Sequence, residues 1–464
     1  MKRRAFLKST AILAAAAGSM DIMKAAQTAM GMEAVDDPEA SAISDELPPL
    51  ETGGKLIISA PMLQNYAETS MGVAFAVSDM ANGYVIVGEK EDLSDGRKVL
   101  CGGYRVTDIS DKVILVRLIG LKPATRYYYR IGADRISYLG GYKMKILGNE
   151  EDSRIYSFVT AGKKARAHFC VINDTHVQMV PFGLAIEKIA ELNPSCVIWN
   201  GDASNVEETI EAQMRIFLTP DIKRTDYASE IPYLLAPGNH DNRGMANRHL
   251  EKVWMFRQGE ERSSRDWDLG RNFAVRMGDI AMIGLDTAED KVDTNPRFAG
   301  LFTSKVYREA QTVWLKDVLK RKEISSAPYL VAFCHIPLFD PDPTHNPGDI
   351  YPDDSDPRYT TDYASWQRTC ARMWCPLLEK AGCQVIITGH QHHYKYFAPE
   401  PGRPWAEIVG GGPEMGVNSK RDPTPNPVKF PTVVEGEVTD GRLTIRIHNL
   451  LKGEVIDTFT YRRR

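Results

Sequence analysis

The stretch LLAPGNHD, residues 234–241, joins a short apolar run to a cluster of polar side chains. The run LLA has the character of a short buried strand, and the Pro-Gly pair ends it. Asn239, His240 and Asp241 follow at once. A strand that stops in such a cluster is typical of a sheet whose loops carry a binding site. A single GNHD is more often an ordinary turn, so its meaning depends on the rest of the chain.

Four more apolar runs stop in the same kind of cluster. They are CVINDTH (170–176), VIWNGD (197–202), VAFCHIP (331–337) and VIITGHQHH (385–393). Six of the chain's ten histidines lie in these stretches, and five of them are candidate site residues, namely His176, His240, His335, His390 and His392. Ligand sites in α/β sheets lie at the carboxyl ends of strands, where separate loops converge. We therefore expect the five segments to form one site.

The alternation of strand-like and helix-like segments around these runs predicts a layered α/β fold for residues 163–464. Strands are expected at 167–173, 196–200, 232–236, 273–285 (as a hairpin), 328–334 and 383–388. Helices are expected at 182–192, 206–218, 304–322 and 363–381. Residues 431–461 return to strand character around a DG turn and are expected to complete a second sheet. Strands that alternate with helices are typical of the α/β class.

Residues 55–162 predict a separate all-β domain, because apolar and β-branched runs recur between turn residues without a helical period. The stretch LIGLKPATRYYYRI places Leu121, Pro123, Thr125 and Tyr127 in the spacing L-x-P-x-T-x-Y. This spacing resembles the fibronectin type III sandwich, in which the tyrosine hydroxyl bonds to nearby backbone. Any other β-sandwich would fit these runs as well.

The order D-x-H, G-D, G-N-H-D, H and G-H-x-H resembles the calcineurin-like metallophosphoesterase superfamily, over roughly residues 165–460. The β-domain ahead of it resembles the N-terminal domain of purple acid phosphatases. The resemblance implies a four-layer α/β/β/α sandwich with a two-metal site between paired sheets. One metal would be held by Asp174, His176, Asp202 and His392, and the other by Asp202, Asn239, His335 and His390, with Asp202 bridging. Mixed imidazole and carboxylate ligands suit Fe, Mn or Zn, and the identity of the two ions stays open.

The resemblance also implies a reaction. Two such ions about 3.5–4 Å apart can hold a bridging hydroxide for in-line attack on phosphorus. Two divalent ions bring about four positive charges against three negative ones from Asp174, Asp202 and the hydroxide, so a neutral Asn239 preserves attraction for a phosphate. His240 is expected to donate to a phosphate oxygen or to protonate the leaving alkoxide, or else merely to pack in a turn. Asp241 is expected to orient its ring.

Two positions depart from the purple acid phosphatase pattern. Those enzymes have an iron-binding tyrosine three residues after the bridging aspartate, and this chain has Asn205 there. It also has His176 where they have glycine. An iron–tyrosinate centre is therefore not expected.

The N-terminus, MKRRAFLKSTAILAAAAGSM, resembles a twin-arginine export signal with Arg3 and Arg4 as the pair. The apolar stretch that follows is too short to span a membrane, and no transmembrane helix is expected. Residues 1–34 are predicted to be the signal, and the acidic, Pro-containing residues 35–54 a linker. The signal implies the twin-arginine export machinery as a partner and a periplasmic or secreted location. A cytosolic amphipathic tail is the alternative.

Charge and cysteine content exclude other classes. The chain has 57 Lys and Arg against 61 Asp and Glu, a net charge of −4, and no basic block beyond the terminal YRRR. We therefore expect no binding to a nucleic acid duplex. Seven cysteines leave at least one thiol free and do not suggest a disulfide framework. Cys370 and Cys375 are too far apart on a predicted helix to be bridged, whereas Cys375 with Cys383 is conceivable.

Several polar residues and two loops are consistent with more than one role. His393 is expected to point away from the metals, because successive strand-end residues point apart. Arg243 is read as a solvated turn residue, with a bidentate phosphate contact as the alternative. The long acidic loop 339–363 fits a lid over the site and a disordered insert equally well. The Gly-rich turn at 408–416 would permit close backbone approach near the metals or serve as a tight structural turn.

Three functions are consistent with these features. The first is an exported phosphomonoesterase that uses two metals on a small phosphate-ester substrate. The second is a phosphodiesterase acting on nucleotides or lipid headgroups with the same metal centre. The third is a non-catalytic cell-envelope binding protein, which the complete ligand set argues against.

Overall fold

The computed structural model describes residues 54–464 apart from 102–108, 141–142, 257–268, 292, 294, 296–297, 300, 302 and 340–361, and it omits the side chains of 361–368. The predicted signal, the linker up to residue 53 and most of the loop 339–363 therefore lie outside the described residues. The described part from Gly54 to Arg464 forms one compact unit.

Among these residues the largest sheet has nine strands, in the order β20-β19-β18-β9-β10-β11-β1-β2-β5. Its strands are β1 (Met62–Gln64), β2 (Ser70–Ala76), β5 (Val113–Ile119), β9 (His168–Ile172), β10 (Cys196–Trp199), β11 (Tyr233–Leu235), β18 (Thr432–Thr439), β19 (Arg442–Asn449) and β20 (Glu454–Tyr461). Strands β9, β10, β11 and β1 run parallel, whereas the strands toward both edges pair antiparallel. The carboxyl ends of β9, β10 and β11 therefore meet at one edge.

The second sheet of the described chain has six strands in the order β12-β13-β14-β15-β17-β16. They are β12 (Phe273–Met277), β13 (Ile280–Leu285), β14 (Tyr329–Cys334), β15 (Val385–Thr388), β16 (Lys395–Phe397) and β17 (Ala406–Val409). Strands β13, β14, β15 and β17 are parallel. A third sheet contains β3 (Ala81–Gly88), β4 (Arg97–Leu100), β6 (Arg126–Tyr138), β7 (Met144–Glu151) and β8 (Tyr156–Val159).

The side chains of β9 alternate between two cores, as the two-residue period of a strand requires. Phe169 and Val171 lie in the core between the nine- and six-stranded sheets, and the Phe169 ring meets Phe333 of β14 edge-on with centroids 5.6 Å apart. Cys170 and Ile172 face the opposite way, into a core shared with helices α4 (Met179–Leu192) and α5 (Ile210–Phe217). Two sheets thus pack face to face, and α4 and α5 cover the outer side of one of them.

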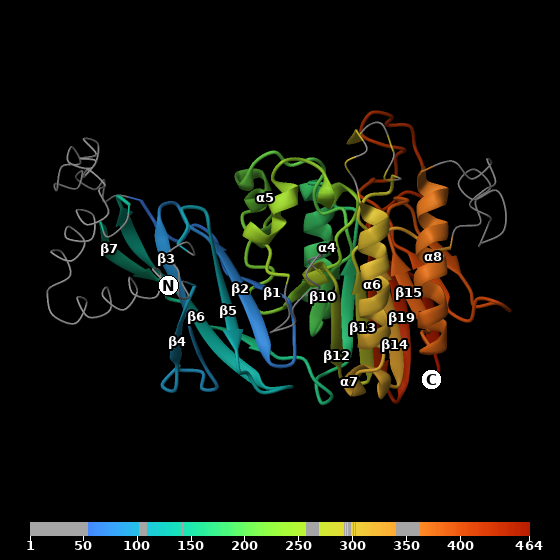
Figure 1. Ribbon diagram of the computed structural model, residues 1–464, viewed down its shortest axis with the longest axis horizontal. Coiled ribbons are helices and arrows are strands. Elements are labelled where there is room, and N and C mark those ends of the chain that lie inside the picture. The colour runs from blue at the N-terminus through green and yellow to red at the C-terminus, as the bar shows by residue number, and fades with distance from the viewer. Residues whose placement is uncertain are drawn as a thin grey trace, which may run out of the picture. The chain divides into compact units, whose positions relative to one another are not determined.

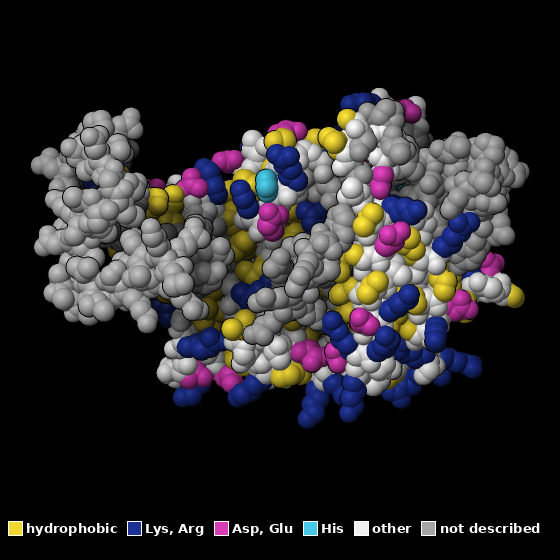
Figure 2. Space-filling model, viewed as in Figure 1, with side chains coloured by type: hydrophobic (Ala, Val, Ile, Leu, Met, Phe, Trp, Pro, Cys, Tyr) yellow, Lys and Arg dark blue, Asp and Glu magenta, His cyan; other side chains and the backbone are white. Residues whose placement is uncertain are grey.

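The outer side of the six-stranded sheet is covered by helices α6 (Ser304–Val318), α7 (Lys322–Ser325) and α8 (Asp362–Lys380). Figure 1 shows α6 and α8 side by side against β13 and β14. Leu315 of α6 and Trp374 of α8 are fully buried in this core. On its solvent side α6 exposes Val306 and Val313, and Figure 2 shows these helices as a surface on which apolar and charged side chains are interspersed. Such mixing is ordinary for the surface of a folded protein.

The expected α/β class is observed, and each expected strand and helix is present with shifted ends. Residues 273–285 form the predicted hairpin, β12 with β13. Helix α5 starts later than expected, at Ile210, because the Thr209 hydroxyl accepts a hydrogen bond from the Ala212 amide (3.2 Å) and so caps the helix there. The expected helix 304–322 ends at Val318, and the short α7 follows it.

The nine-stranded sheet extends across the boundary that the sequence places between residues 162 and 163. Gln64 of β1 pairs in parallel with Tyr233 of β11, so β1, β2 and β5 continue the sheet that contains β9 and β10. Within residues 55–162 the hydroxyl of Tyr127 accepts a hydrogen bond from the Lys122 amide at 2.9 Å, a contact of the kind expected for the tyrosine. The assignment of 55–162 as a fibronectin III-like domain remains a prediction.

Candidate metal centre

Seven predicted metal ligands follow five parallel strands of the two facing sheets. β9 leads to Asp174 and His176, β10 to Asp202, and β11 to Asn239, while β14 leads to His335 and β15 to His390 and His392. Two sets of side chains have ligand atoms within 4.8 Å of one another: Asp174 with His176 and His392, and Asp202 with His335 and His390. A third such group, His176 with Asp202 and His240, shares one member with each set. The carboxyl ends of strands from both sheets therefore converge, as the sequence predicts.

The first set surrounds one carboxylate oxygen. Asp174 Oδ1 lies 3.6 Å from His176 Nε2 and 3.4 Å from His392 Nε2. The two Nε2 atoms are 2.9 Å apart. Asp202 Oδ2 lies 3.5 Å from His176 Nε2 as well. Ligands of one transition-metal ion, each about 2.0–2.2 Å from it, are spaced similarly.

The second set contains Asp202. His335 Nε2 lies 3.1 Å from Asp202 Oδ2 and 3.6 Å from Asp174 Oδ1. His390 Nδ1 lies 3.1 Å from Asn239 Oδ1, so the amide oxygen of Asn239 faces this set. Asp202 contacts imidazoles of both sets, which is the position that a bridging carboxylate requires.

Two buried atoms in this cluster fit a cation. Asp174 Oδ1 and His335 Nε2 have no hydrogen-bonding partner among the described residues, and both residues are fully buried. Burial opposes the charged form of His335, but Asp202 and Asp174 outweigh it and raise the pKa of His335 to about 9. Burial alone would raise the pKa of Asp174, yet the neighbouring imidazoles hold it well below its usual range. Carboxylate and imidazole donors buried together in this way suit transition-metal ions.

The backbone at the cluster is strained. Five of the seven predicted ligands have positive φ, with values of 49° for Asp174, 45° for His176, 51° for Asp202, 69° for His390 and 58° for His392. Each such non-glycine residue costs about 1–3 kcal/mol, and such residues persist where the surroundings determine them. The strain turns successive side chains toward one point at the strand ends.

Two glycines leave room for the ligands. A Cβ on Gly201, which has φ of 84°, would lie 2.4 Å from the His335 ring, and a Cβ on Gly238 would lie 2.3 Å from Asp202 Oδ1. The glycines that precede Asp202 and Asn239 in the sequence therefore allow the two loops to approach His335 closely. Close approach is the reason these positions cannot carry a side chain.

Three imidazoles are held through their second nitrogen. His335 Nδ1 lies 2.9 Å from the Asn200 carbonyl oxygen, and His176 Nδ1 lies 2.8 Å from Asn205 Oδ1. His392 Nδ1 lies 2.8 Å from Glu414 Oε1. Outer partners of this kind fix the tautomer and orientation of a metal-binding imidazole. Sequence reasoning noted Asn205 only as a missing tyrosine and overlooked Glu414, whose single signal is its place in the Gly-rich turn 408–416.

His240 lies beside the first set. Its ring centroid is 4.9 Å from that of His176, and its ligand atoms lie within 4.8 Å of those of His176 and Asp202. Its Nδ1 lies 3.3 Å from the Asn205 carbonyl oxygen, and its Nε2 lies 3.0 Å from Arg243 Nη1. Burial lowers the pKa of His240, and the charge of Arg243 lowers it further.

Arg243 is not the solvated turn residue that the sequence suggests. Its Nε and Nη2 donate to the two carboxylate oxygens of Glu289 at 2.8 and 2.5 Å, and Nη2 also donates to Asp290 Oδ1 at 2.9 Å. The Glu289 side chain is fully buried and that of Arg243 is 20% exposed. The guanidinium is thus anchored by two carboxylates and turns one nitrogen to His240.

Asp241 has contacts other than the expected one with the His240 ring. Its carboxylate accepts hydrogen bonds from the amides of Asp202, Gly238 and Ser204, at 2.9 to 3.0 Å. It also accepts one from the Ser204 hydroxyl at 2.9 Å. Asp241 therefore braces the two loops that present Asp202 and Asn239, and no described contact joins it to the ring. Because Asp241 is fully buried, its carboxylate needs hydrogen-bonding partners inside the protein, and these contacts supply them.

Three other histidines lie outside these two ligand sets. His393 Nδ1 lies 3.1 Å from the Gln391 carbonyl oxygen, outside the described ligand groups. His168 and His448 both contact Glu435, at 2.9 and 3.0 Å, within the nine-stranded sheet. All seven cysteines are free thiols, including Cys375 and Cys383. No helix of the described residues is long and apolar enough to cross a membrane.

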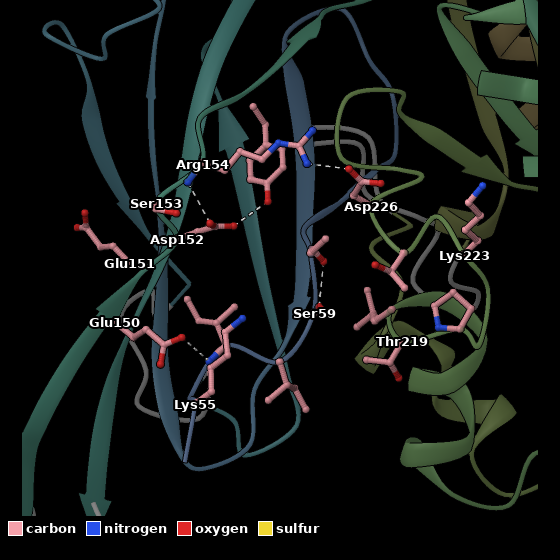
Figure 3. Close-up of a pocket in the computed structure, with 17 residues that line it drawn as sticks. Lys55, Ser59, Glu150, Glu151, Asp152, Ser153, Arg154, Thr219, Lys223 and Asp226 are labelled. Atoms are coloured by element: carbon pink, nitrogen blue, oxygen red, sulfur yellow. Dashed lines mark hydrogen bonds and ion pairs between the residues drawn. The ribbon is translucent and has the colours of Figure 1, made fainter. Parts of the chain in front are cut away.

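A cavity of about 740 Å³ lies elsewhere, between the strands near residue 150 and the loop after α5, and Figure 3 shows its lining. Several of its polar groups contact one another: Arg154 donates to Asp226 at 2.7 Å, and the Tyr156 hydroxyl donates to Asp152 at 2.7 Å. Glu150 accepts a hydrogen bond from the Leu56 amide at 2.7 Å. This cavity shares no lining residue with the histidine cluster. We therefore place the candidate site at the strand ends, where the cluster lies.

Comparison with known proteins agrees with this location. The family model described as Calcineurin-like phosphoesterase matches residues 167–394, which include all seven predicted ligands. No curated protein sequence matches the chain.

Two solved structures have similar folds. The purple acid phosphatase PPD1 from yellow lupin (Lupinus luteus) seeds has 15% identity and a TM-score of 0.58, over 87% of this chain and 74% of that one. A structure of PhoD has 12% identity and a TM-score of 0.55, over 90% of this chain and 92% of that one. At these identities the likeness concerns the fold alone. The family match and the histidine–aspartate clusters together support a calcineurin-like metallophosphoesterase domain in this chain.

Proposed function

We propose that this protein is a metal-dependent phosphoesterase that hydrolyses small phosphate esters, with monoesters as the favoured substrates. The observation that carries the proposal is the pair of adjacent ligand sets, which Asp202 joins because it contacts His176 of the first set at 3.5 Å and His335 of its own set at 3.1 Å. When bound, a pair of transition-metal ions would activate water as the nucleophile and stabilise the charge on the phosphate.

The chain's own residues hold this centre and limit its charge. Asp174 and Asp202 are the carboxylates of the two described ligand sets. Asn239 adds an oxygen donor without a charge, so the site keeps a net attraction for a phosphate group. Asp174, Asp202 and His335 are buried, whereas His240, His390 and His392 are half-buried. Among the described residues, the side of the site that a substrate can reach is therefore the side on which these three histidines lie.

His240 is proposed to contact a phosphate or leaving-group oxygen. Its ring is packed against His176 and is held between the Asn205 carbonyl and Arg243, so its position is fixed before a substrate arrives. A group held in this way loses little conformational freedom on binding, which favours catalysis.

The test is to replace Asp202 with Ala, and in a second variant His335 with Ala, and to assay chromogenic monoester and diester substrates. We expect activity to fall by at least about 10³-fold in both variants. Each variant lacks a metal ligand, and the metals contribute several kcal/mol of transition-state stabilisation. Glu454→Ala, an exposed site in β20, is the control. Turnover that survives in chelator-treated, metal-free protein would contradict the proposal, and faster hydrolysis of the diester would make the protein a phosphodiesterase.

We further propose that the protein is exported through the twin-arginine route to the periplasm or beyond. The support is Arg3 and Arg4 ahead of a short apolar stretch, and a two-metal site is suited to a route that carries proteins already folded. The test is to replace Arg3 and Arg4 with Lys in the full chain and to fractionate the cells. We expect the variant to stay in the cytoplasm, and its unchanged export would contradict this route.

A further inference from the structure

The imidazoles of the metal centre differ in what holds them. His335 is held by a backbone carbonyl, that of Asn200, and His176 by the neutral side chain of Asn205. His392 is held by a carboxylate, because its Nδ1 lies 2.8 Å from Glu414 Oε1. Of these three imidazoles, His392 alone therefore has a charged partner on its second nitrogen.

Glu414 is itself unusual. Its side chain is only 10% exposed, and its contact with His392 is the one ion pair that the described residues provide for it. The second carboxylate oxygen, Oε2, is buried and has no hydrogen-bonding partner among those residues. A buried carboxylate is costly unless positive charge lies close to it. The imidazole of His392 is the group through which such charge can reach it.

The loop that carries Glu414 is built against His392. A Cβ on Gly412 would lie 2.6 Å from both the Cα and the Cβ of His392, so the turn passes over this residue at the closest possible distance. His392 itself has φ of 58°. The two backbones and the 2.8 Å contact together leave the ring one orientation, in which Nε2 faces Asp174 Oδ1 at 3.4 Å and His176 Nε2 at 2.9 Å.

We propose that Glu414 is a positioning residue that fixes the tautomer of His392 and strengthens it as a donor, so that the metal held by Asp174, His176 and His392 is bound more tightly than it would be without the carboxylate. The imidazole donates its Nδ1–H to Glu414, which leaves the Nε2 lone pair for the metal and increases its basicity. The effect is selective for one of the two metals, since Asn239 and His335 belong to the other. This inference rests on the proposed two-metal centre.

The experiment is a calorimetric titration of the chelator-treated full chain with Zn²⁺ or Mn²⁺. It compares the unmodified protein with Glu414→Ala and Glu414→Gln. We expect two binding steps, of which Glu414→Ala weakens one by about 10–100-fold and leaves the other unchanged. Glu414→Gln keeps an oxygen that accepts from Nδ1–H but loses the charge, so its affinity should be intermediate. Asn239→Ala, which removes a ligand from the other metal, identifies the second step.

The controls separate folding, metal binding and hydrolysis. Glu454→Gln, at an exposed position, should leave both steps unchanged, and thermal unfolding of each metal-free variant shows whether the substitution merely disturbs the fold. Equal weakening of both steps, or no weakening in Glu414→Ala, would overturn the inference. If the unmodified protein binds two metals with the expected dependence on Glu414 but hydrolyses no phosphate ester, the inference stands and the proposed function fails.

Discussion

The Nε2 atoms of His176 and His392 lie 2.9 Å apart, although 216 positions separate the two residues in the sequence. One follows a strand of the nine-stranded sheet and the other a strand of the six-stranded sheet. Two imidazole nitrogens at this distance can share a proton or a metal ion, and the adjacent Asp174 and Asp202 favour a cation. The stability of this end of the sandwich should therefore depend on metal.

Removal of metal should destabilise the protein. Without cations, the charged partners that the described residues provide for the buried Asp174 and Asp202 are imidazoles. A ligand present at about 100 times its Kd stabilises the folded state by about 2.7 kcal/mol, so chelation should lower the unfolding midpoint and added Zn²⁺, Mn²⁺ or Fe²⁺ should restore it. Differential scanning calorimetry measures the shift. An unchanged midpoint together with retained hydrolysis would show that no metal is bound at this cluster.

Asp241→Ala should reduce stability and metal binding together. The substitution leaves the amides of Asp202, Gly238 and Ser204 without their acceptor in a buried place. Each unsatisfied buried donor costs about 1–3 kcal/mol, so a total loss of several kcal/mol in the free energy of unfolding is expected. Urea unfolding measures it, with the exposed Asp317→Ala as the control. A variant of normal stability with a defect in kcat alone would instead favour a role for Asp241 in orienting the ring of His240.

Arg243→Ala should destabilise the protein and lower kcat. It removes the guanidinium from the fully buried Glu289 and one contact from His240. Breaking a buried ion pair by removal of one partner costs about 3–5 kcal/mol, and the partial exposure of Arg243 places the expected value near the lower end. Arg248→Ala, at an exposed position, is the control.

A double variant tests whether the charge left on Glu289 causes the loss of stability in Arg243→Ala. If the uncompensated charge of Glu289 causes the loss, Arg243→Ala combined with Glu289→Gln should be more stable than Arg243→Ala alone. Additive losses of stability in the double variant would rule out that coupling.

Acid should weaken the nine-stranded sheet through Glu435. Burial opposes ionisation of this residue, but hydrogen bonds from His168 and His448 and the charge of Arg446 hold the pKa of Glu435 well below its usual range. A depressed carboxyl pKa contributes stability that is fully present above the pKa of the unfolded chain, about 4.3, and is lost as the pH falls below it.

The measurement is the free energy of unfolding in urea at a series of pH values from 7 down to 3. Glu435→Gln should be less stable than the unmodified protein at pH 7, and the difference should shrink as the pH falls. A difference that is constant with pH would mean that the ionised carboxylate does not contribute.

The local features of this protein could be predicted from its sequence. Apolar runs that stop at Asp174, Asp202, Asn239, His335 and His390 predict strand ends with ligands, because the period of a strand and the residues that break it are local properties. The α/β class follows from the alternation of such runs with helical segments. The spacing G-H-x-H places two imidazoles one residue apart by covalent structure alone.

Only the tertiary structure decided what surrounds these ligands. Glu414 reaches His392, Arg243 reaches Glu289, and Asp241 braces the loop of Asp202 instead of the His240 ring. The pairing of β1 with β11 likewise joins strands from both sides of the expected domain boundary. Such contacts depend on how separate loops pack in three dimensions, and the side chains involved carry no periodic signal. The sequence therefore determines where strands end and which donors follow them, whereas the packing of the two sheets determines which partners hold those donors in place.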